Sequence, residues 1–401
     1  MSGVVIIGAG HAAGQAAASL RQAKYEGDIT IIGDEAHIPY QRPPLSKAYL
    51  KGEQSADKVY LRAESFYADR NITMKLSTTA TAIDTAAKTV ALNTDETLSY
   101  DHLLISTGSR PRKLSIEGSG LPGIHYLRTM DDVDGLREGM RPDANLVIVG
   151  GGYIGLEVAA VGRELGLNVH VLEMEERILQ RVTTPEMSAY YHQLHEGRGV
   201  HIHTSTGVTG FAGDGKVEEV ICGDQRFAAD IVIVGIGIIA NTELAEAAGI
   251  HCDNGIVVDE HCRTSDPFVY AAGDCTNHPN PLLDRRLRLE SVPNAMDQAR
   301  VSTANMLGDE KTYAAIPWFW SDQYELKLQM VGFSADGDTQ VLRGDMASNQ
   351  FAVFYLKDGK VVAADAVNSP KEFMLCKQLV GKPADPAFLT DPESDLKTLL
   401  A

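Results

Sequence analysis

Two glycine-rich loops of the kind that hold nucleotides constrain this chain more than any other feature. The first loop, Gly8-Ala9-Gly10-His11-Ala12-Ala13, follows an apolar run at residues 4–7 and precedes an alanine-rich segment. The second loop, residues 150–155, follows the apolar run 146–149. A strand, a glycine turn and a helix N-terminus together bring backbone N–H groups close to a pyrophosphate. Two such units predict that the chain binds two dinucleotides.

Each loop is followed by a second apolar run and then by an acidic residue. Asp34 follows the first loop and Glu173 the second, each slightly beyond the roughly 20-residue spacing of a ribose-binding acid. A carboxylate there accepts hydrogen bonds from the adenosine ribose and repels a 2′-phosphate. Met174 and two glutamates follow Glu173, with no adjacent lysine or arginine. The second loop is therefore predicted to bind NADH rather than NADPH.

Length and composition narrow the class of protein. A chain of 401 residues is too long for one ordinary core, which predicts two or three domains. The net charge of −18 argues against a nucleic-acid or anionic-membrane surface. Five scattered cysteines, with no close pair, indicate reduced thiols and a cytoplasmic protein. No membrane span and no metal site are predicted.

The strand expected at residues 269–274 decides which loop holds which cofactor. It ends in Gly273 and Asp274, and it can return to the sheet of the first domain. An aspartate there can accept a hydrogen bond from a flavin's ribityl chain. A helix capped by Ser291, with Pro293 in its first turn, would direct its positive end at the flavin pyrimidine. These elements predict FAD in the first domain.

Five motifs, in order along nearly the whole chain, resemble one family. They are residues 42–47 (RPPLSK), 150–157 (GGGYIGLE), 273–275 (GDC), 290–294 (ESVPN) and 317–323 (PWFWSDQ). The chain resembles the FAD-dependent NADH:ferredoxin reductase family of bacterial oxygenase systems. The resemblance implies an α/β fold with two Rossmann-like dinucleotide-binding domains, glutathione-reductase-like, plus a C-terminal α+β domain. We expect a discontinuous FAD-binding domain at 1–111 and 242–317, an NADH-binding domain at 112–241 and the C-terminal domain at 318–401.

Together, the motifs and the resemblance imply two sets of cofactor contacts. Tightly bound FAD would contact Gly8, Gly10, Ala12, Ala13, Asp34, Arg42, Lys47, Ala80, Thr107, Gly108, Arg128, Gly273, Asp274, Ser291 and Val292. NADH, the co-substrate, would contact Gly150, Gly152, Tyr153, Ile154, Gly155, Glu157, Glu173, Gly235, Ile236 and Gly237.

Three residues carry the catalytic expectations. The resemblance places Lys47 and Glu157 beside the isoalloxazine, where their pairing would help to gate the approach of the nicotinamide. It also places Trp320 beside the flavin, on the side from which electrons leave. On residue type alone, Lys47 and Glu157 equally fit solvated surface charges, and Trp318 and Trp320 fit an ordinary aromatic core.

The absence of a cysteine pair bears on the electron acceptor. Disulfide reductases carry such a pair on an early segment beside the flavin, whereas residues 40–50 contain no cysteine here. The resemblance implies a [2Fe-2S] ferredoxin serving a P450 or Rieske-type oxygenase as the acceptor. Because such ferredoxins are acidic, docking needs a local basic patch. The resemblance implies Arg62 and Arg300 as candidates for it, although each equally fits an ordinary solvated arginine.

Two other functions stay open from the sequence. One is an NADH oxidase or peroxidase-like flavoenzyme, and the other is a redox-sensing, partner-binding flavoprotein. The first usually needs a cysteine near the flavin, and the second needs targeting runs or long insertions that this chain lacks. The oligomeric state is open, with a monomer expected.

Overall fold

The computed structural model describes residues 3–400 and divides the chain into two compact units. The first comprises Met1–Arg42, Ser55–Arg110 and Ile238–Pro317. The second comprises Pro43–Gln54, Pro111–Gly237 and Trp318–Ala401. Each unit is described by itself.

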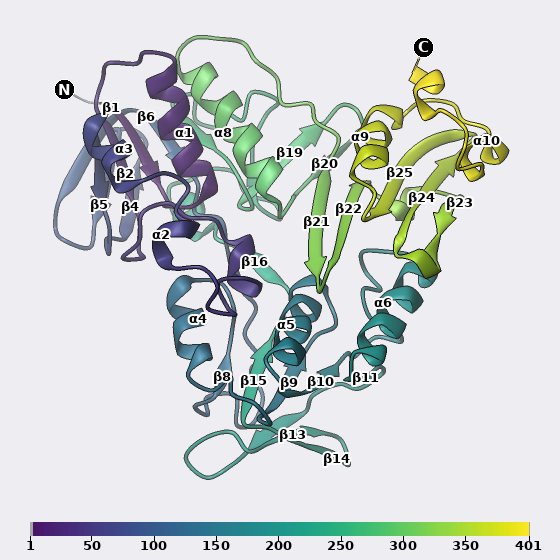
Figure 1. Cartoon of the computed structure of the whole chain (residues 1–401). Helices are drawn as coiled ribbons and strands as arrows, with labels where there is room; N and C mark the ends of the chain where they lie inside the picture. Colours follow the sequence, from purple (N-terminus) through teal and green to yellow (C-terminus); the bar gives the residue numbers. More distant parts are fainter. Residues whose placement is uncertain (1–2, 401) are drawn as a thin grey trace. The chain divides into compact units, whose positions relative to one another are not determined.

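The first unit is built on a seven-stranded sheet (Figure 1). Its strands are β1 (Gly3–Ile7), β2 (Ile29–Ile32), β3 (Ile72–Lys75), β4 (Ala80–Asp84), β5 (Thr89–Leu92), β6 (Thr97–Ile105) and β18 (Val269–Ala271). β3, β2, β1 and β6 are parallel neighbours, and β5 and β4 extend the sheet as an antiparallel hairpin. β18 pairs with β6 in parallel, which confirms that a late strand returns to the first sheet.

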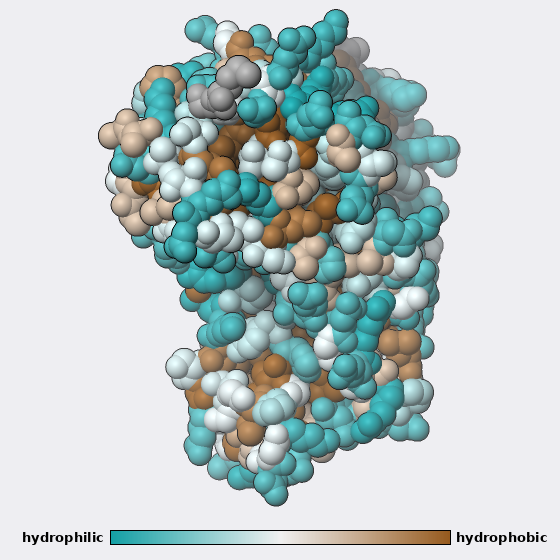
Figure 2. Space-filling view, turned by 90° about the vertical axis from the view of Figure 1, so that its left-hand side faces the viewer, coloured by the Kyte–Doolittle hydropathy of each residue, from teal (hydrophilic) through white to brown (hydrophobic). Residues whose placement is uncertain are grey.

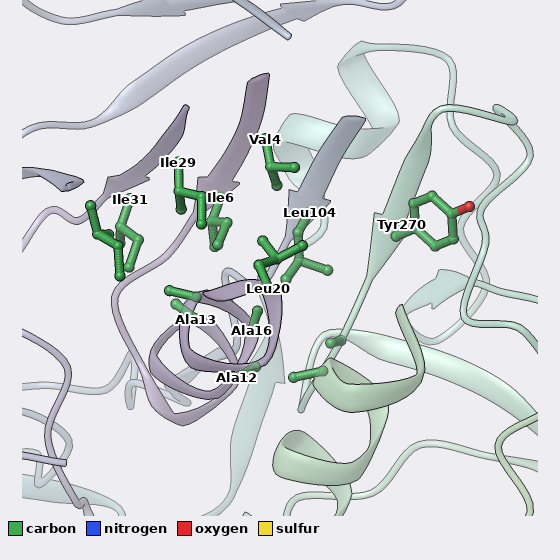
Figure 3. Close-up of a cluster of buried hydrophobic side chains, with 14 of the residues drawn as sticks. Val4, Ile6, Ala12, Ala13, Ala16, Leu20, Ile29, Ile31, Leu104 and Tyr270 are labelled. Carbon is green, nitrogen blue, oxygen red and sulfur yellow. The ribbon is translucent and has the colours of Figure 1, made fainter. Parts of the chain in front are cut away.

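Small residues on α1 (His11–Gln22) allow that helix to pack closely on the sheet (Figure 3). Ala12, Ala13 and Ala16 are buried below Ile6 of β1 and Ile31 of β2. α1 also packs beside α8 (Val292–Met306), so both helices cover the same side of the sheet (Figure 1). The buried alanines therefore fix the position of the helix that begins at the first glycine loop.

A parallel sheet of five strands organises the middle of the second unit, in the order β11-β10-β9-β15-β8. These strands are β8 (Ile124–His125), β9 (Asn145–Val149), β10 (Asn168–Leu172), β11 (Val200–His203) and β15 (Ile231–Val234). α5 (Tyr153–Glu164) begins at the second glycine loop and connects β9 to β10, and α6 (Pro185–Gly197) connects β10 to β11. A separate antiparallel sheet is formed by β12 (Gly210–Ala212), β13 (Glu219–Cys222) and β14 (Gln225–Ala228).

The C-terminal segment of the second unit forms an antiparallel sheet in the order β21-β22-β25-β24-β23. Its strands are β21 (Trp318–Gln323), β22 (Leu326–Gly332), β23 (Thr339–Asp345), β24 (Gln350–Lys357) and β25 (Lys360–Val367). Asp358 and Gly359 form the hairpin turn between β24 and β25, both with positive φ. α9 (Pro370–Leu379) packs on β25, and α10 (Pro386–Thr390) and η4 (Leu396–Leu400) follow.

The remaining described elements are short. They are η1 (Pro43–Ser46), α2 (Ala56–Val59), α3 (Glu64–Asp69), β7 (Ser109–Pro111), α4 (Met130–Arg137), β16 (Ile238–Ala240), α7 (Glu243–Ala247), β17 (Ile256–Val257), β19 (Thr276–Asn280), β20 (Arg285–Leu287), η2 (Ser334–Asp336) and η3 (Met346–Ser348).

The compact units cut the chain differently from the expected three domains in two places. Residues 43–54 were assigned to the FAD-binding segment, but they contact the second unit. Tyr49 donates a hydrogen bond to Asp134 (3.1 Å), and Arg137 donates to the carbonyl of Leu50 (3.3 Å). The C-terminal segment also clusters with residues 111–237. The three-domain division with its boundaries stays a prediction.

One face of the molecule is mainly polar. Figure 2 shows a face on which hydrophilic side chains predominate and hydrophobic ones lie between them. Among the helices of residues 3–400, none is both long enough and apolar enough to cross a membrane.

Candidate functional site

The first glycine loop has a backbone that only glycine fits comfortably. Gly8 has φ +104°, and a Cβ there would lie 2.2 Å from the carbonyl oxygen of Ser106 on the neighbouring strand. Gly10 is the N-cap of α1, and a Cβ there would meet nothing within 4 Å. No acidic side chain lies in the first turn of α1. The open space and the uncapped helix N-terminus fit the pyrophosphate of FAD.

The second loop repeats this geometry in the other unit. Gly150 has φ +110°, and a Cβ there would lie 2.4 Å from the carbonyl oxygen of Gly235. A Cβ on Gly155 would lie 2.2 Å from the carbonyl oxygen of Gly150, so glycine lets α5 approach the loop. Gly152 caps α5 and opens onto free space, with no acidic residue in the first turn. This loop fits the pyrophosphate of NADH.

Residues around the second loop complete this candidate NADH site. The side chain of Glu173 accepts hydrogen bonds from the backbone N–H groups of Gly151 (2.7 Å) and Glu175 (2.9 Å). This fixes the carboxylate beside the loop, while the remaining lone pairs of its oxygens can still accept from ribose hydroxyls. Ile154 is half exposed, and Tyr153 donates to the sulfur of Met330. Burial raises the pKa of Tyr153 well above its ordinary value.

The turn formed by Gly235, Ile236 and Gly237 follows β15, the strand next to β9. The N–H of Gly235 bonds to the carbonyl of Val149, which precedes the glycine loop. Gly237 has φ +104° and accepts from the N–H of Arg112. The turn is thus held at the same sheet edge as the loop, as expected for a residue set that contacts one ligand.

On the FAD side, Asp34 is exposed, and the next acid along the chain has a defined role. Glu35 accepts a hydrogen bond from Arg42 (2.7 Å) and another from Tyr40. Glu35 therefore orients the guanidinium of Arg42, which the resemblance assigns to FAD. Sequence reasoning missed Glu35 because it considered only the first acid after the strand.

The predicted flavin-ribityl acid also has a defined neighbour. Asp274 accepts a hydrogen bond from the hydroxyl of Ser109 (2.8 Å), and the N–H of Gly273 bonds to Gln298 of α8 (2.8 Å). Ser291 caps α8 by accepting from the N–H of Asn294 (3.3 Å), as predicted. The bond between Gly273 and Gln298 therefore ties the Gly273–Asp274 turn to the helix.

The other assigned FAD contacts lie in varied settings. Thr107 bonds to the backbone of Asn241 through its hydroxyl (2.7 Å), and Gly108 has φ +62°. Ala80 begins β4, and Val292 begins α8. Arg128 belongs to the second unit, where its N–H bonds to Asp132 at the start of α4. Their contacts with FAD stay predictions.

Lys47 and Glu157 form an ion pair, as the gating hypothesis requires. Lys47 Nζ lies 2.6 Å from Glu157 Oε2, and the side chain of Glu157 is only 2% exposed. The same oxygen accepts from the Ser46 hydroxyl (2.5 Å), and Oε1 accepts from the Ser321 hydroxyl (2.7 Å). The alternative of a helix-surface glutamate is wrong, because this carboxylate is buried among three donors from two other segments.

Trp320 lies on β21 in an aromatic group. Its ring centroid is 5.6 Å from that of Trp318, and Trp318 is 5.9 Å from Phe373 of α9. Lys377 Nζ lies 4.4 Å above the Trp318 ring. Trp320 remains partly exposed, and its place beside a flavin stays a prediction.

The two candidate docking arginines are exposed and lie in the first unit. Arg300 of α8 forms an ion pair with Asp297, one turn earlier on the helix. Arg62 lies over the ring of Phe66, 5.1 Å from its centroid. Their contact with a partner stays a prediction.

The thiols do not form a redox centre. All five cysteines are free, and the first along the chain is Cys222. Burial raises the pKa of Cys275, which follows Asp274, to about 11, and that of Cys262 to about 12. Protonated, buried thiols are poor nucleophiles. Among residues 3–400, no group of three or more potential ligands is placed to hold a metal ion.

Comparison with known families agrees with the paired glycine loops. Residues 2–299 match the model of the family described as pyridine nucleotide-disulphide oxidoreductase. The chain belongs to this family of oxidoreductases. Residues 318–400 match a second model, described as reductase C-terminal, so the chain adds this segment to the oxidoreductase core.

Individual relatives in this family span nearly the whole chain. The chain is 45% identical to putidaredoxin reductase CamA of Pseudomonas putida, covering 99% of this chain and 96% of that protein. It is 42% identical to the ferredoxin–NAD(+) reductase component of the anthranilate 1,2-dioxygenase system of Burkholderia cepacia, covering 99% and 97%. The reductase in a solved covalent putidaredoxin reductase–putidaredoxin complex is similar, with a TM-score of 0.96, 45% identity and coverage of 100% and 98%.

Proposed function

We propose that the chain is an NADH:ferredoxin oxidoreductase that serves a P450 or Rieske-type oxygenase. The observation that carries the proposal is the pair of glycine loops, each capping a helix with open space at the pyrophosphate position. The loops follow strands of two separate sheets, β1 and β9, so each can hold its own dinucleotide. The reductase C-terminal segment and the relatives from oxygenase systems support the choice of acceptor.

FAD belongs to the first loop and NADH to the second. When bound, the flavin supplies the chemistry that this chain lacks, because it accepts two electrons from a nicotinamide and releases them singly. The chain's own residues bind and orient. Asp274 and Arg42 would hold FAD from the first unit, while Glu173 would select a nicotinamide dinucleotide without a 2′-phosphate.

Lys47 and Glu157 act at the nicotinamide end of the reaction. Their ion pair would hold Lys47 until NADH arrives. Once released, the positive charge of Lys47 would stabilise the negative charge that develops on the flavin. Trp320 lies on the route by which electrons leave. The resemblance implies these roles, and all three residues belong to the second unit.

The thiols disfavour the oxidase or peroxidase alternative. Such enzymes use a reactive cysteine near the flavin, but residues 3–221 contain none. Cys252, the partly exposed thiol, has a pKa raised by burial to about 11. The redox-sensing alternative is not favoured by any observation on residues 3–400. The reduced thiols support a cytoplasmic location, and we propose a monomer.

One assay distinguishes the three functions. FAD-loaded protein is mixed with NADH and cytochrome c, with and without a [2Fe-2S] ferredoxin from an oxygenase system. We expect cytochrome c reduction to depend strongly on the ferredoxin, and to be much less efficient with NADPH. Rapid oxygen consumption without ferredoxin dependence would support the oxidase instead. Slow turnover with every acceptor would support the redox sensor.

A further inference from the structure

A continuous line of buried hydrogen bonds leaves Glu157 on the side away from Lys47. Ser321 lies 2.7 Å from Glu157 Oε1, and Gln323 Nε2 lies 3.1 Å from Ser321 Oγ. Gln323 Oε1 lies 2.8 Å from His195 Nε2, and Tyr324 OH lies 3.3 Å from His195 Nδ1. The line therefore connects α5, β21 and α6 within the second unit.

The inner members of this line are almost completely buried, and Tyr324 at its outer end is half-buried. Ser321 and His195 are 0% exposed, and Gln323 is 1% exposed. A buried polar group without a partner loses its hydration and gains nothing in return, so each of these groups needs the bond it makes. Burial also lowers the pKa of His195 to about 4, so its imidazole is neutral at physiological pH.

The chemistry of Glu157 sets the direction of every bond in the line. A carboxylate only accepts, so Ser321 must donate to it. The Ser321 oxygen then accepts from the amide NH2 of Gln323, which turns the amide oxygen toward His195. Neutral His195 must therefore carry its proton on Nε2 and accept from Tyr324 on Nδ1. All four donors point toward Glu157.

We propose that Ser321, Gln323 and His195 are positioning residues that hold the Glu157 carboxylate in one orientation while Lys47 leaves it. This rests on the proposed function, in which Lys47 and Glu157 act on NADH. When Lys47 moves, only Ser46 and Ser321 still donate to the buried carboxylate. Bonds that point the same way polarise one another, so Gln323 and His195 strengthen the Ser321 donor.

The line of hydrogen bonds orients the Glu157 carboxylate and does not conduct protons to it. A proton passing from Tyr324 to Glu157 would have to cross the amide of Gln323, which has no readily exchanged proton on its oxygen side. His195 is also held neutral by its burial. Its tautomer is consequently fixed by a carboxylate that it does not touch.

The first test reads the His195 tautomer directly. Long-range proton–nitrogen NMR on histidine-labelled protein reports which ring nitrogen carries the proton. A His195→Gln variant identifies the signal among the 12 histidines. We expect the proton on Nε2, and a proton on Nδ1 would overturn the proposal. This readout does not depend on turnover.

The second test changes the polarity of the line without changing its volume. In Gln323→Glu, the new carboxylate competes with Glu157 for the single Ser321 hydroxyl. By stopped flow with FAD-loaded protein, we expect the limiting rate of flavin reduction by NADH to fall between about tenfold and about a hundredfold. The apparent Kd for NADH should change much less. Gln340→Glu, the same change at an exposed position of β23, is the matched control.

Tyr324→Phe keeps the test decisive when Gln323→Glu does not fold. It deletes one oxygen at a half-buried position and removes only the outermost donor. We expect a smaller fall in the limiting rate, with the Nε2 proton retained. A folded Gln323→Glu protein at the wild-type rate would overturn the positioning role, as would an unchanged rate in Tyr324→Phe. Failure of NADH to reduce the flavin of the wild-type protein would instead overturn the proposed function.

Discussion

At the scale of single residues, the sequence predicts backbone requirements better than long-range partners. Gly8 and Gly150 could be predicted because a positive φ and a close neighbouring carbonyl exclude other residues locally. The partners of Glu157 could not be predicted in this way. Ser46 and Ser321 lie more than a hundred positions away on either side, and only the fold brings them to one carboxylate. Lys47 was assigned through the family resemblance.

Replacing Lys47 tests the ion pair. In Lys47→Met, the buried Glu157 keeps two hydroxyl donors but loses its counter-charge. We expect the limiting rate of flavin reduction by NADH to fall by about tenfold or more, measured by stopped flow. Lys51→Met is the matched control, because Lys51 lies on the same segment as Lys47. Lys51 Nζ pairs with Glu164 (2.5 Å), whose side chain is more exposed than that of Glu157. An equal fall in both variants would show a general loss of charge rather than a role for Lys47.

At the scale of elements, apolar runs predicted the strands that are buried on both faces. The apolar runs 4–7 and 146–149 lie within one residue of the bounds of β1 and β9, and the second apolar runs that follow the loops form β2 and β10. β21 was not expected as a strand, because Trp318–Gln323 mixes large aromatic and polar residues without a plain apolar run. Its pairing with β22 supplies what the local pattern lacks.

A buried aspartate in β25 should make the stability of the second unit depend on pH. Asp365 accepts hydrogen bonds from Tyr355 (2.8 Å) and Thr183 (3.1 Å), and burial raises its pKa to about 6. Because this pKa is above the unfolded value of about 3.9, its contribution to stability is complete below pH 4. That contribution is lost as the pH rises through about 6, and it amounts to about 3 kcal/mol.

The variant Asp365→Asn removes this titration. We expect the unfolding free energy of the wild type, minus that of the variant, to decrease between pH 4 and pH 7. Chemical denaturation at several pH values measures the difference. Asp338→Asn, at an exposed aspartate, should show no comparable trend. A constant difference between wild type and Asp365→Asn would contradict the prediction.

At the scale of the whole molecule, the return of a late strand to the first sheet was predicted, whereas the contacts of residues 43–54 with the second unit were not. The return of β18 to the first sheet follows from its buried pattern and from the expected topology. The assignment of residues 43–54 to the second unit depends on side-chain contacts at Lys47, Tyr49 and Leu50. Hydrophobic periodicity carries no information about such polar contacts, so these contacts could not be predicted from the sequence.

The net charge of −18 makes docking of an acidic ferredoxin depend on local cations. Arg300→Glu places a second acid next to Asp297, so we expect the KM for ferredoxin to rise several-fold at low salt. The KM for NADH should not change. Arg226→Glu is the matched control, because Arg226 is also exposed and paired, with Glu219 (2.8 Å), and the charge change is identical. Equal effects of both variants would indicate net charge rather than a docking site.

The pleat of β21 separates two duties on one strand. Ser321 and Gln323 point to the buried side that leads to Glu157, and Trp318 and Trp320 alternate with them. With Trp320 on the proposed electron-exit side, substitutions on the tryptophan side would alter transfer to the acceptor and leave the donors to Glu157 in place. Alternate positions of this one strand would then be the place to graft acceptor specificity from one reductase onto another.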